Sequence, residues 1–421
     1  MKKRLLDMKT RRRISRLIAE RYQRARKKDK GKILDEFVEL TGYNRRYGGW
    51  LLRNIGSKRV IYIKGRRYIV VGKDSKGQKG IRKRPVIYDE GVVKELKKVW
   101  YILDMPAGKR LAPYLKEIIP ILEERKELEI ERDIREKLLK VSAATIDRLL
   151  KEEKKKWRIR GKKRTKPGSL LKSQIPIRTF AEWNEKVPGF IEIDLVEHSG
   201  GVARGIYAQT LDATDIFTGW TETICIENKS QVNVFEGLQK IIKQYPFVIL
   251  GIDSDNGSEF INQHLIKFCQ ENKITFTRSR SYKKNDNCYV EQKNWSIVRK
   301  TVGYSRYETE KEINLINQIY FHLRLYTNFF QPQMKLINKT RIGSKVTKKY
   351  DKAKTPYQRV IECEQIDKTT KEKLKQIYKG LNPVKLKREI VSLQCKLFEL
   401  IRKKKTIQKK EEIIEKEKIF V

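Results

Sequence analysis

The stretch that decides the fold runs from Val248 to Glu291 and opens with the sequence VILGIDSDNG at residues 248–257. Its first five residues are apolar and read as a buried strand, whereas the following residues favour a turn. The break places Asp255 just beyond the end of the strand. Because α/β sheets bind their ligands at the carboxyl ends of strands, Asp255 is a candidate functional residue.

Two further carboxylates accompany Asp255. Asp194 lies inside the apolar run FIEIDLVE at residues 190–197, and Glu291 lies in CYVEQKN at residues 288–294. Between Asp255 and Glu291 there are 35 residues (291 − 255 − 1). Taken singly, each acid also fits a structural role, as a satisfied buried carboxylate, a turn former or a helix N-terminal acid. Together, one Asp inside a strand, one at a strand end and one Glu on a helix predict a site for a divalent metal ion.

These residues resemble the catalytic core shared by retroviral integrases and many bacterial insertion-sequence transposases. That family places an Asp on its first strand and a second Asp in a (Thr/Ser)-Asp-Asn-Gly turn, here Ser254-Asp255-Asn256-Gly257. Its Glu follows 35 residues later in a Val-Glu-x-x-Asn setting, here Val290-Glu291-Gln292-Lys293-Asn294. The resemblance covers about residues 179–307 and implies a ribonuclease-H-like fold.

The resemblance also implies the cofactor and the roles of the acids. Two Mg²⁺ ions, for which Mn²⁺ would substitute, are expected about 4 Å apart. Asp194 would bridge both ions, Asp255 would hold one, and Glu291 would hold the other. Two neighbouring acids compete for these roles. Asp253 is disfavoured because Asn256-Gly257 follows Asp255, whereas Glu192 and Asp194 share one strand face and only the family pattern favours Asp194.

The expected core alternates strands and helices as a mixed sheet with helices on both faces. Strands are predicted at 190–197, 206–212, 220–226, 248–252 and 274–277, and helices at 230–243, 258–271 and 287–304. In the last helix, Glu291, Trp295, Val298 and Val302 recur at helical spacing. This spacing predicts that Glu291 faces the sheet together with the three apolar residues.

Composition points to a polyanionic partner. The 421 residues contain 97 Lys and Arg against 52 Asp and Glu, a formal net charge of +45 spread along the chain. Such an excess favours nucleic acid over a membrane surface, although part of it fits a solvated lysine-rich surface. No apolar run approaches a membrane span, and the five scattered cysteines form no zinc motif and fit a reducing cytoplasm. We therefore expect a cytoplasmic, nucleoid-associated bacterial protein.

The region before the core predicts DNA-binding modules. Residues 1–57 have the outline of a helix-turn-helix with basic residues Arg45 and Arg46 on its third helix, although a plain three-helix bundle fits too. Residues 58–88 predict a hairpin with a basic tip at 64–67, either a DNA-contacting wing or a linker. Residues 89–156 predict a second helix-turn-helix-like domain, with Ser142 as a helix N-cap and Arg148 facing outward, or a purely structural helical domain.

The remaining segments are a basic linker at 157–178, the catalytic core at 179–310, a small C-terminal domain at 311–365 with short basic strands, and a helical basic tail at 366–421. In the tail, an apolar stripe recurs at heptad spacing over about two heptads. It predicts either packing on its own domain or a dimer zipper. Its members are Leu386, Ile390, Leu393, Leu397 and Leu400.

Around the site, further residues are candidates for contact with DNA. Lys284 and Lys293 would contact phosphates, and Asn294 would orient metal ligands or DNA. Solvated surface charge is an equally good reading of each lysine taken alone.

These features predict a DNA transposase that cleaves the 3′ ends of a mobile element and transfers the strands into target DNA. Its partners would be double-stranded DNA at the terminal repeats and at the target, and it would act as a homo-oligomer. Two alternatives remain. One is a non-catalytic DNA-binding protein derived from a transposase, and the other is a hydrolytic nuclease of the ribonuclease-H-like fold.

Overall fold

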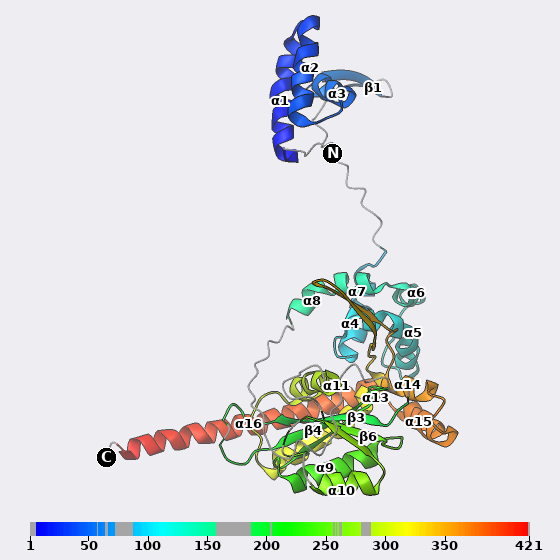
Figure 1. Cartoon of the computed structure of the whole chain (residues 1–421), viewed down its shortest axis with the longest axis vertical. Coiled ribbons are helices and arrows are strands. Elements are labelled where there is room, and N and C mark those ends of the chain that lie inside the picture. Colours follow the sequence, from blue (N-terminus) through cyan, green and yellow to red (C-terminus); the bar gives the residue numbers. More distant parts are fainter. Residues whose placement is uncertain are drawn as a thin grey trace. The chain divides into compact units, whose positions relative to one another are not determined.

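A computed structural model of the chain describes residues 6–56, 58–63, 66–71, 87–156, 187–202, 204–255, 257, 259–260, 263–278 and 288–419 (Figure 1). It divides into two compact units, Met1–Val86 and Ile87–Val421. The predicted linker at 157–178 lies outside the described residues. The segment boundaries that we derived from sequence remain predictions.

The first unit is a three-helix domain followed by a hairpin. Its core is made by Phe37 and Leu52, which are fully buried, and by apolar residues of all three helices packed around them. Asn44 starts the third helix by accepting a hydrogen bond from the Arg46 backbone, and Gly42 ends the second at a φ of 67°. The elements are α1 Met8–Arg24, α2 Lys27–Thr41, α3 Arg45–Asn54, β1 Lys58–Ile63 and β2 Arg66–Val71.

The second unit begins with five helices. Ser142 caps α7 by accepting a hydrogen bond from the Thr145 backbone, as the sequence predicts, and Arg148 is exposed on that helix. Fully buried Leu111, Ile118 and Leu138 belong to the core of this unit. The helices are α4 Glu90–Ile102, α5 Gly108–Glu124, α6 Arg132–Lys140, α7 Ala143–Leu149 and α8 Lys151–Lys156.

A five-stranded mixed sheet forms the centre of this unit, with the strand order β5-β4-β3-β6-β7. The first three strands in sequence are antiparallel, and β6 and β7 are parallel to β3 and to each other. This confirms the predicted ribonuclease-H-like mixed sheet. The strands are β3 Phe190–Glu197, β4 Gln209–Asp215, β5 Thr221–Ile226, β6 Gly251–Ser254 and β7 Thr275–Arg278.

Two strands are shifted from their predicted positions. We expected strands at 206–212 and 248–252, but β4 begins at Gln209 and β6 at Gly251. Ile206 and Val248 are 71% and 77% exposed, so these apolar residues lie outside the paired sheet and misled the prediction. The shift moves Asp212 from the end of a predicted strand to the centre of β4.

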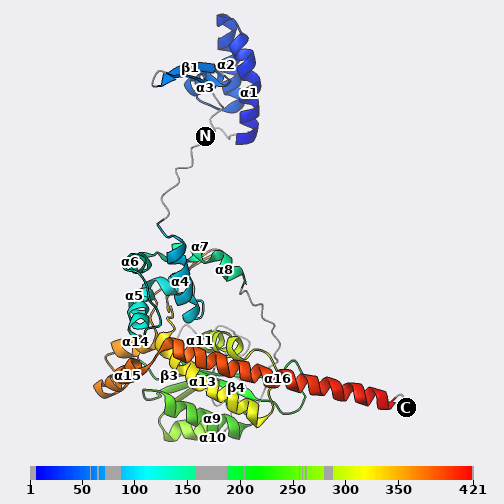
Figure 2. The same ribbon diagram turned by 180° about the vertical axis from the view of Figure 1, so that it is seen from behind.

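Helices cover both faces of the sheet. Figures 1 and 2 show α9 and α10 on one side and α11 on the other. Gly237 lies at the contact of α9 with the sheet, where a Cβ atom would approach Ile226 to 3.0 Å. The helices are α9 Gln231–Gln244, α10 Gln263–Glu271, α11 Cys288–Lys293, the π-helical turn η2 Asn294–Arg299, and α12 Lys300–Val302.

The C-terminal part packs onto this core. Helix α13 lies against β5 and against α16. The apolar stripe of α16 is buried in this unit at Leu386, Ile390 and Leu397, so it packs on its own domain rather than remaining free. The elements are α13 Glu310–Phe330, β8 Leu336–Ile342, β9 Lys345–Tyr350, α14 Pro356–Glu362, α15 Lys368–Gly380 and α16 Pro383–Ile419.

Substitutions in α16 test this packing. Leu397 is fully buried, whereas its neighbour Phe398 is 46% exposed. We expect Leu397→Ala to lower the free energy of unfolding by about 2–5 kcal/mol, because it leaves a cavity in the core. Phe398→Ala should change it by less than about 1 kcal/mol. Chemical denaturation measures both, and equal effects would contradict the packing.

Candidate functional site

Three adjacent strands bring acidic residues to one place. Asp194 in β3 pairs with Asp212 in β4, and Ile193 pairs with Ser254 in β6. Asp255 follows Ser254 directly, so it lies just past the end of β6 at the level of Asp194. Residues opposite one another in neighbouring strands project to the same face of a sheet. The sheet register therefore brings the predicted first and second Asp residues together.

Asp194 is held by two hydrogen bonds. Its Oδ1 accepts from the backbone N–H of Leu195 at 2.8 Å, and its Oδ2 accepts from Nδ2 of Asn294 at 2.6 Å. Burial, together with the charges of Asp255 and Glu291, raises the pKa of Asp194 to about 7 in spite of these hydrogen bonds. Both other predicted carboxylates thus act electrostatically on Asp194.

Asp255 and Glu291 occupy chain positions that orient their carboxylates. Oδ1 of Asp255 accepts a hydrogen bond from the backbone N–H of Gly257 at 2.8 Å, which closes the turn after β6. Glu291 lies in the first turn of α11 and is exposed. Glu291 is therefore accessible at the rim, whereas Asp255 and Asp194 are both half-buried.

Glu192, the competing acid of β3, has a different environment from Asp194. It is fully buried, and its Oε2 accepts hydrogen bonds from the backbone N–H groups of Tyr289 and Val290 at 2.8 and 2.9 Å. Burial raises its pKa well above the ordinary value, and Asp253 adds to this. Glu192 therefore anchors the start of α11, the helix that carries Glu291.

Asp253, the other competing acid, is buried in β6 opposite Glu192. Its Oδ1 accepts a hydrogen bond from Oγ1 of Thr277 in the next strand at 2.5 Å. These contacts make it part of the sheet interior rather than of the rim where Asp255 lies.

The predicted apolar stripe through Glu291 is wrong. Val298 and Val302 are buried, but Trp295 is 49% exposed and Glu291 is exposed. The reason is the π-helical turn η2, which begins at Asn294 and changes the spacing of residues along the helix. Glu291 therefore projects to the rim of the sheet instead of facing its apolar surface.

Asn294 and Lys293 both make contacts within the protein. Asn294 hydrogen-bonds to Asp194, so it fits the expected role in orienting a metal ligand. Lys293 is half-buried, and its Nζ donates to the backbone carbonyl of Gly219 at 3.4 Å. Burial lowers the pKa of Lys293 to about 7, while the charge of Asp212 opposes this effect.

Asp212 is the residue that our sequence analysis missed. It is fully buried in β4 directly opposite Asp194. The available signal was an acid between Leu211 and Ala213, the same pattern that identified Asp194 between Ile193 and Leu195. We overlooked Asp212 because the strand was predicted at 206–212, which placed this residue at a strand end instead of at the centre.

The other predicted DNA contacts lie elsewhere in the chain. Arg45 and Arg46 are exposed on α3 in the first unit, where Arg45 forms an ion pair with Asp35. Arg148 is exposed on α7 in the second unit. Lys284 lies outside the described residues.

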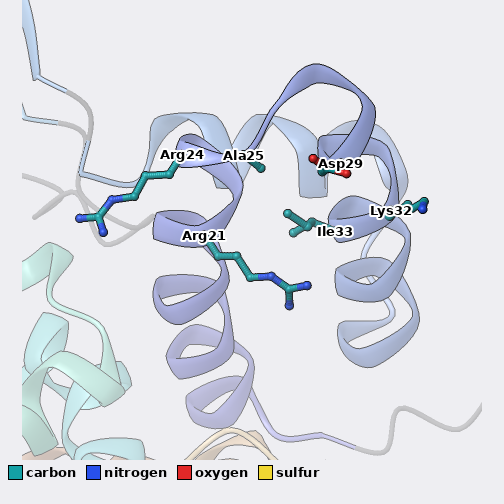
Figure 3. A pocket seen from close by; sticks show the side chains of 6 residues that line it. All are labelled: Arg21, Arg24, Ala25, Asp29, Lys32 and Ile33. Carbon is teal, nitrogen blue, oxygen red and sulfur yellow. The ribbon is translucent and has the colours of Figure 1, made fainter.

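A hollow of about 510 Å³ lies between α1 and α2 in the first unit (Figure 3). Its two arginines already form ion pairs, Arg21 with Glu36 and Arg24 with Glu20. Figure 3 shows the Arg24 side chain pointing away from the hollow. We assign no function to it.

Two features are absent from the described residues. No three His, Cys, Asp or Glu side chains among them stand close enough to share a metal ion as they are. The predicted carboxylates are therefore neighbours rather than an assembled cage. In the same part of the chain, no helix combines the length and apolar character needed to cross a bilayer.

Comparison with known proteins identifies one family model and one long relative. The model of the integrase core domain matches residues 184–284. The uncharacterized protein y4rM of Sinorhizobium fredii is 38% identical over 347 residues, which are 82% of this chain and 94% of y4rM. The matched domain contains Asp194 and Asp255, and y4rM extends the similarity well beyond it.

Solved structures similar to part of the chain are retroviral. The integrase catalytic core of HTLV-2, in complex with magnesium, is 15% identical, covers 35% of this chain and 92% of its own, and has a TM-score of 0.27. The integrase catalytic core of BIV is 16% identical, covers 40% of this chain and 91% of its own, and has a TM-score of 0.28. The fold assignment rests on the strand order and the family model rather than on these scores.

The pKa of Asp194 yields a prediction about stability. Because its pKa is raised from 3.8 to about 7, ionising Asp194 costs folding free energy that accumulates as the pH rises from about 4 to 7. Without metal, Asp194→Asn should therefore be more stable than the wild type by a few kcal/mol at pH 8, and this gain should shrink toward pH 5. Melting temperatures in EDTA measure the difference.

The exposed acid Glu124 on α5 provides the control for this measurement. The difference between Glu124→Gln and the wild type should stay nearly constant with pH. A constant difference for Asp194→Asn as well would contradict the electrostatic environment described for Asp194.

Proposed function

The chain belongs to the family of y4rM and carries an integrase core domain, and we propose that it is a DNA transposase. In this proposal it cleaves the 3′ ends of a mobile element and joins them to target DNA. The observation that supports the proposal is the sheet register that sets Asp255 level with Asp194, together with the charges of Asp255 and Glu291 that act on Asp194.

The acids fit a divalent metal ion. Their donors are carboxylate oxygens alone, which suits Mg²⁺ and also Mn²⁺. The raised pKa of Asp194 reflects an excess of negative charge at one point, and a cation would relieve that excess. Asp194 would contact two ions, with Asp255 on one and Glu291 on the other. Two bound ions would stabilise the attacking and leaving oxygens of an in-line phosphoryl displacement.

The two reactions use one site. In the first, the oxygen of a water molecule bonds to phosphorus, and the 3′ oxygen of the element leaves as a hydroxyl. In the second, that hydroxyl attacks a target phosphodiester and displaces its 3′ oxygen. Asn294 fixes the carboxylate of Asp194 during both reactions, and Glu192 fixes the start of the helix that presents Glu291.

The helical regions before the core would bind DNA. Helices α2 and α3, joined by the turn at Gly42, have the outline of a helix-turn-helix, with Arg46 and Trp50 exposed on α3. Arg45 and, on the second helical module, Arg148 would contribute, as would Lys284. The net charge of +45 supports binding to terminal repeats and target DNA.

Bringing two element ends to one target would require more than one subunit, so we propose a homo-oligomer. Its place of action would be the bacterial cytoplasm, at the nucleoid, where both DNA substrates lie.

Strand transfer tests the proposed activity. A labelled duplex with the sequence of the element end is mixed with a supercoiled plasmid in Mg²⁺, and joined products are counted. Glu291→Gln should reduce joining by roughly 100-fold or more, because a lost metal ligand removes several kcal/mol of charge stabilisation. Glu310→Gln, an exposed acid in the first turn of α13, is the matched control and should join normally. Cleavage without joining would indicate a nuclease, and DNA binding with neither reaction would indicate a non-catalytic protein.

DNA binding by the full chain tests the role of α3. Arg46→Ala should weaken binding to the element end and lower the salt dependence by about one phosphate contact. Arg24→Ala is the control, because Arg24 carries the same charge as Arg46 but pairs with Glu20 on α1. Fluorescence anisotropy at several salt concentrations measures both variants. Equal effects would argue against α3 as the DNA-contacting helix.

A further inference from the structure

Asp212 is an acid for which the fold provides no hydrogen-bond donor. It is fully buried in the central part of β4, and neither Oδ1 nor Oδ2 has a hydrogen-bond partner within the part of the chain that the structure describes. Burying an ionised carboxylate without partners costs several kcal/mol. Such a residue indicates a partner for its charge that the protein itself does not provide.

The other buried acids of the same sheet each accept at least one hydrogen bond, although Oε1 of Glu192 has no partner, and this makes Asp212 distinct. Asp215, three residues along β4, accepts hydrogen bonds from the backbone of Gly189 and from the backbone and hydroxyl of Thr218. Glu222 in β5 forms a two-oxygen ion pair with Arg324. The fold can thus provide hydrogen-bond donors for a buried acid. For Asp212 the hydroxyl of Thr214 lies near enough to lower the pKa but makes no hydrogen bond of normal geometry to either oxygen.

The position of Asp212 points to the metal site. It lies directly opposite Asp194, so both side chains project to the same face of the sheet. Like charges in that arrangement repel one another and destabilise a sheet. Burial raises the pKa of Asp212 well above the ordinary value, and the charge of Asp194 adds to this.

Among the described residues, the side-chain cation that offsets the charge of Asp212 is Lys293 on α11, two residues after Glu291. Its Nζ donates to the carbonyl of Gly219 and makes no ion pair within 4.0 Å of a described acid. Lys293 therefore offsets the charge of Asp212 from a distance and leaves both carboxylate oxygens available.

We propose that Asp212 is a fourth acidic residue of the metal site, with its carboxylate turned toward the ion held by Asp194, either as a direct ligand or through a water on the metal. The proposal rests on the proposed function, because it needs the metal ions of that site. Outer-shell acids of this kind hold and orient the ligands of a metal and commonly change its affinity 10- to 100-fold.

Metal binding by the full chain tests the proposal without an activity assay. The free Mn²⁺ signal in electron paramagnetic resonance is titrated with wild type, Asp212→Asn, Asp194→Asn and Asp215→Asn. We expect Asp212→Asn to weaken Mn²⁺ binding about 10- to 100-fold. In EDTA its melting temperature should equal or exceed that of the wild type, because one of two opposed acids is neutralised.

Asp215→Asn is the matched control, since Asp215 is equally buried in the same strand but fully hydrogen-bonded. It should melt several degrees lower, because the amide nitrogen cannot accept the hydrogen bonds of the lost carboxylate oxygen. It should bind Mn²⁺ as the wild type does. All titrations are made at a temperature where every variant is folded.

Several results would overturn the proposal. If Asp212→Asn binds Mn²⁺ normally while Asp194→Asn does not, Asp212 is outside the metal site, although the proposed function stands. If the wild type itself binds no Mn²⁺, both the proposal and the proposed metal chemistry fail. If the double variant Asp212→Leu/Lys293→Met regains wild-type Mn²⁺ affinity, Asp212 serves only to neutralise Lys293.

Discussion

The mutual repulsion of carboxylates on adjacent strands is the constraint on which the site depends. β3 and β4 place two acids opposite one another, and the end of β6 adds a third. A sheet tolerates this arrangement only where hydrogen bonds or cations compensate the charge. The neighbouring elements supply part of that compensation, through Asn294, the Leu195 backbone and Lys293. In the function that we propose, the remaining negative charge would attract a cation.

The helix that follows the sheet is organised by the same acids. Glu192 accepts hydrogen bonds from the first backbone groups of α11, and Asn294 donates to Asp194 from its far end. Both contacts join β3 to one short helical segment. The π-helical turn between Asn294 and Arg299 then lets Val298 reach the interior while Glu291 stays at the rim. The position of Glu291 is therefore set by polar contacts to one strand rather than by an apolar helix face.

The sequence was sufficient for the elements whose signal is local. An Asp-Asn-Gly turn after an apolar run predicted a strand end, and Ser142 correctly marked a helix start, because turns and caps depend on single residues. The sequence was insufficient where tertiary contacts determine the position of a strand or the geometry of a helix. Exposed Ile206 and Val248 resembled strand residues, which displaced β4 and concealed Asp212. The π-helical turn has no composition signal, so the helical spacing of Glu291 and Trp295 was misleading. The hydrogen-bond partners of Glu192 and Asp194 depend on strand register, so they could not be predicted from the sequence.

The anchoring of α11 has a consequence for synthesis of the protein. Glu192 and its backbone donors are 97 and 98 residues apart in the chain. A growing polypeptide therefore leaves the ribosome with β3 complete long before the donors at Tyr289 and Val290 exist. Until then the helix bearing Glu291 has no attachment point, and the last acid of the site cannot be in place. If the chain acts as we propose, a polypeptide that ends before Tyr289 would therefore be inactive, because it would lack both these donors and Glu291.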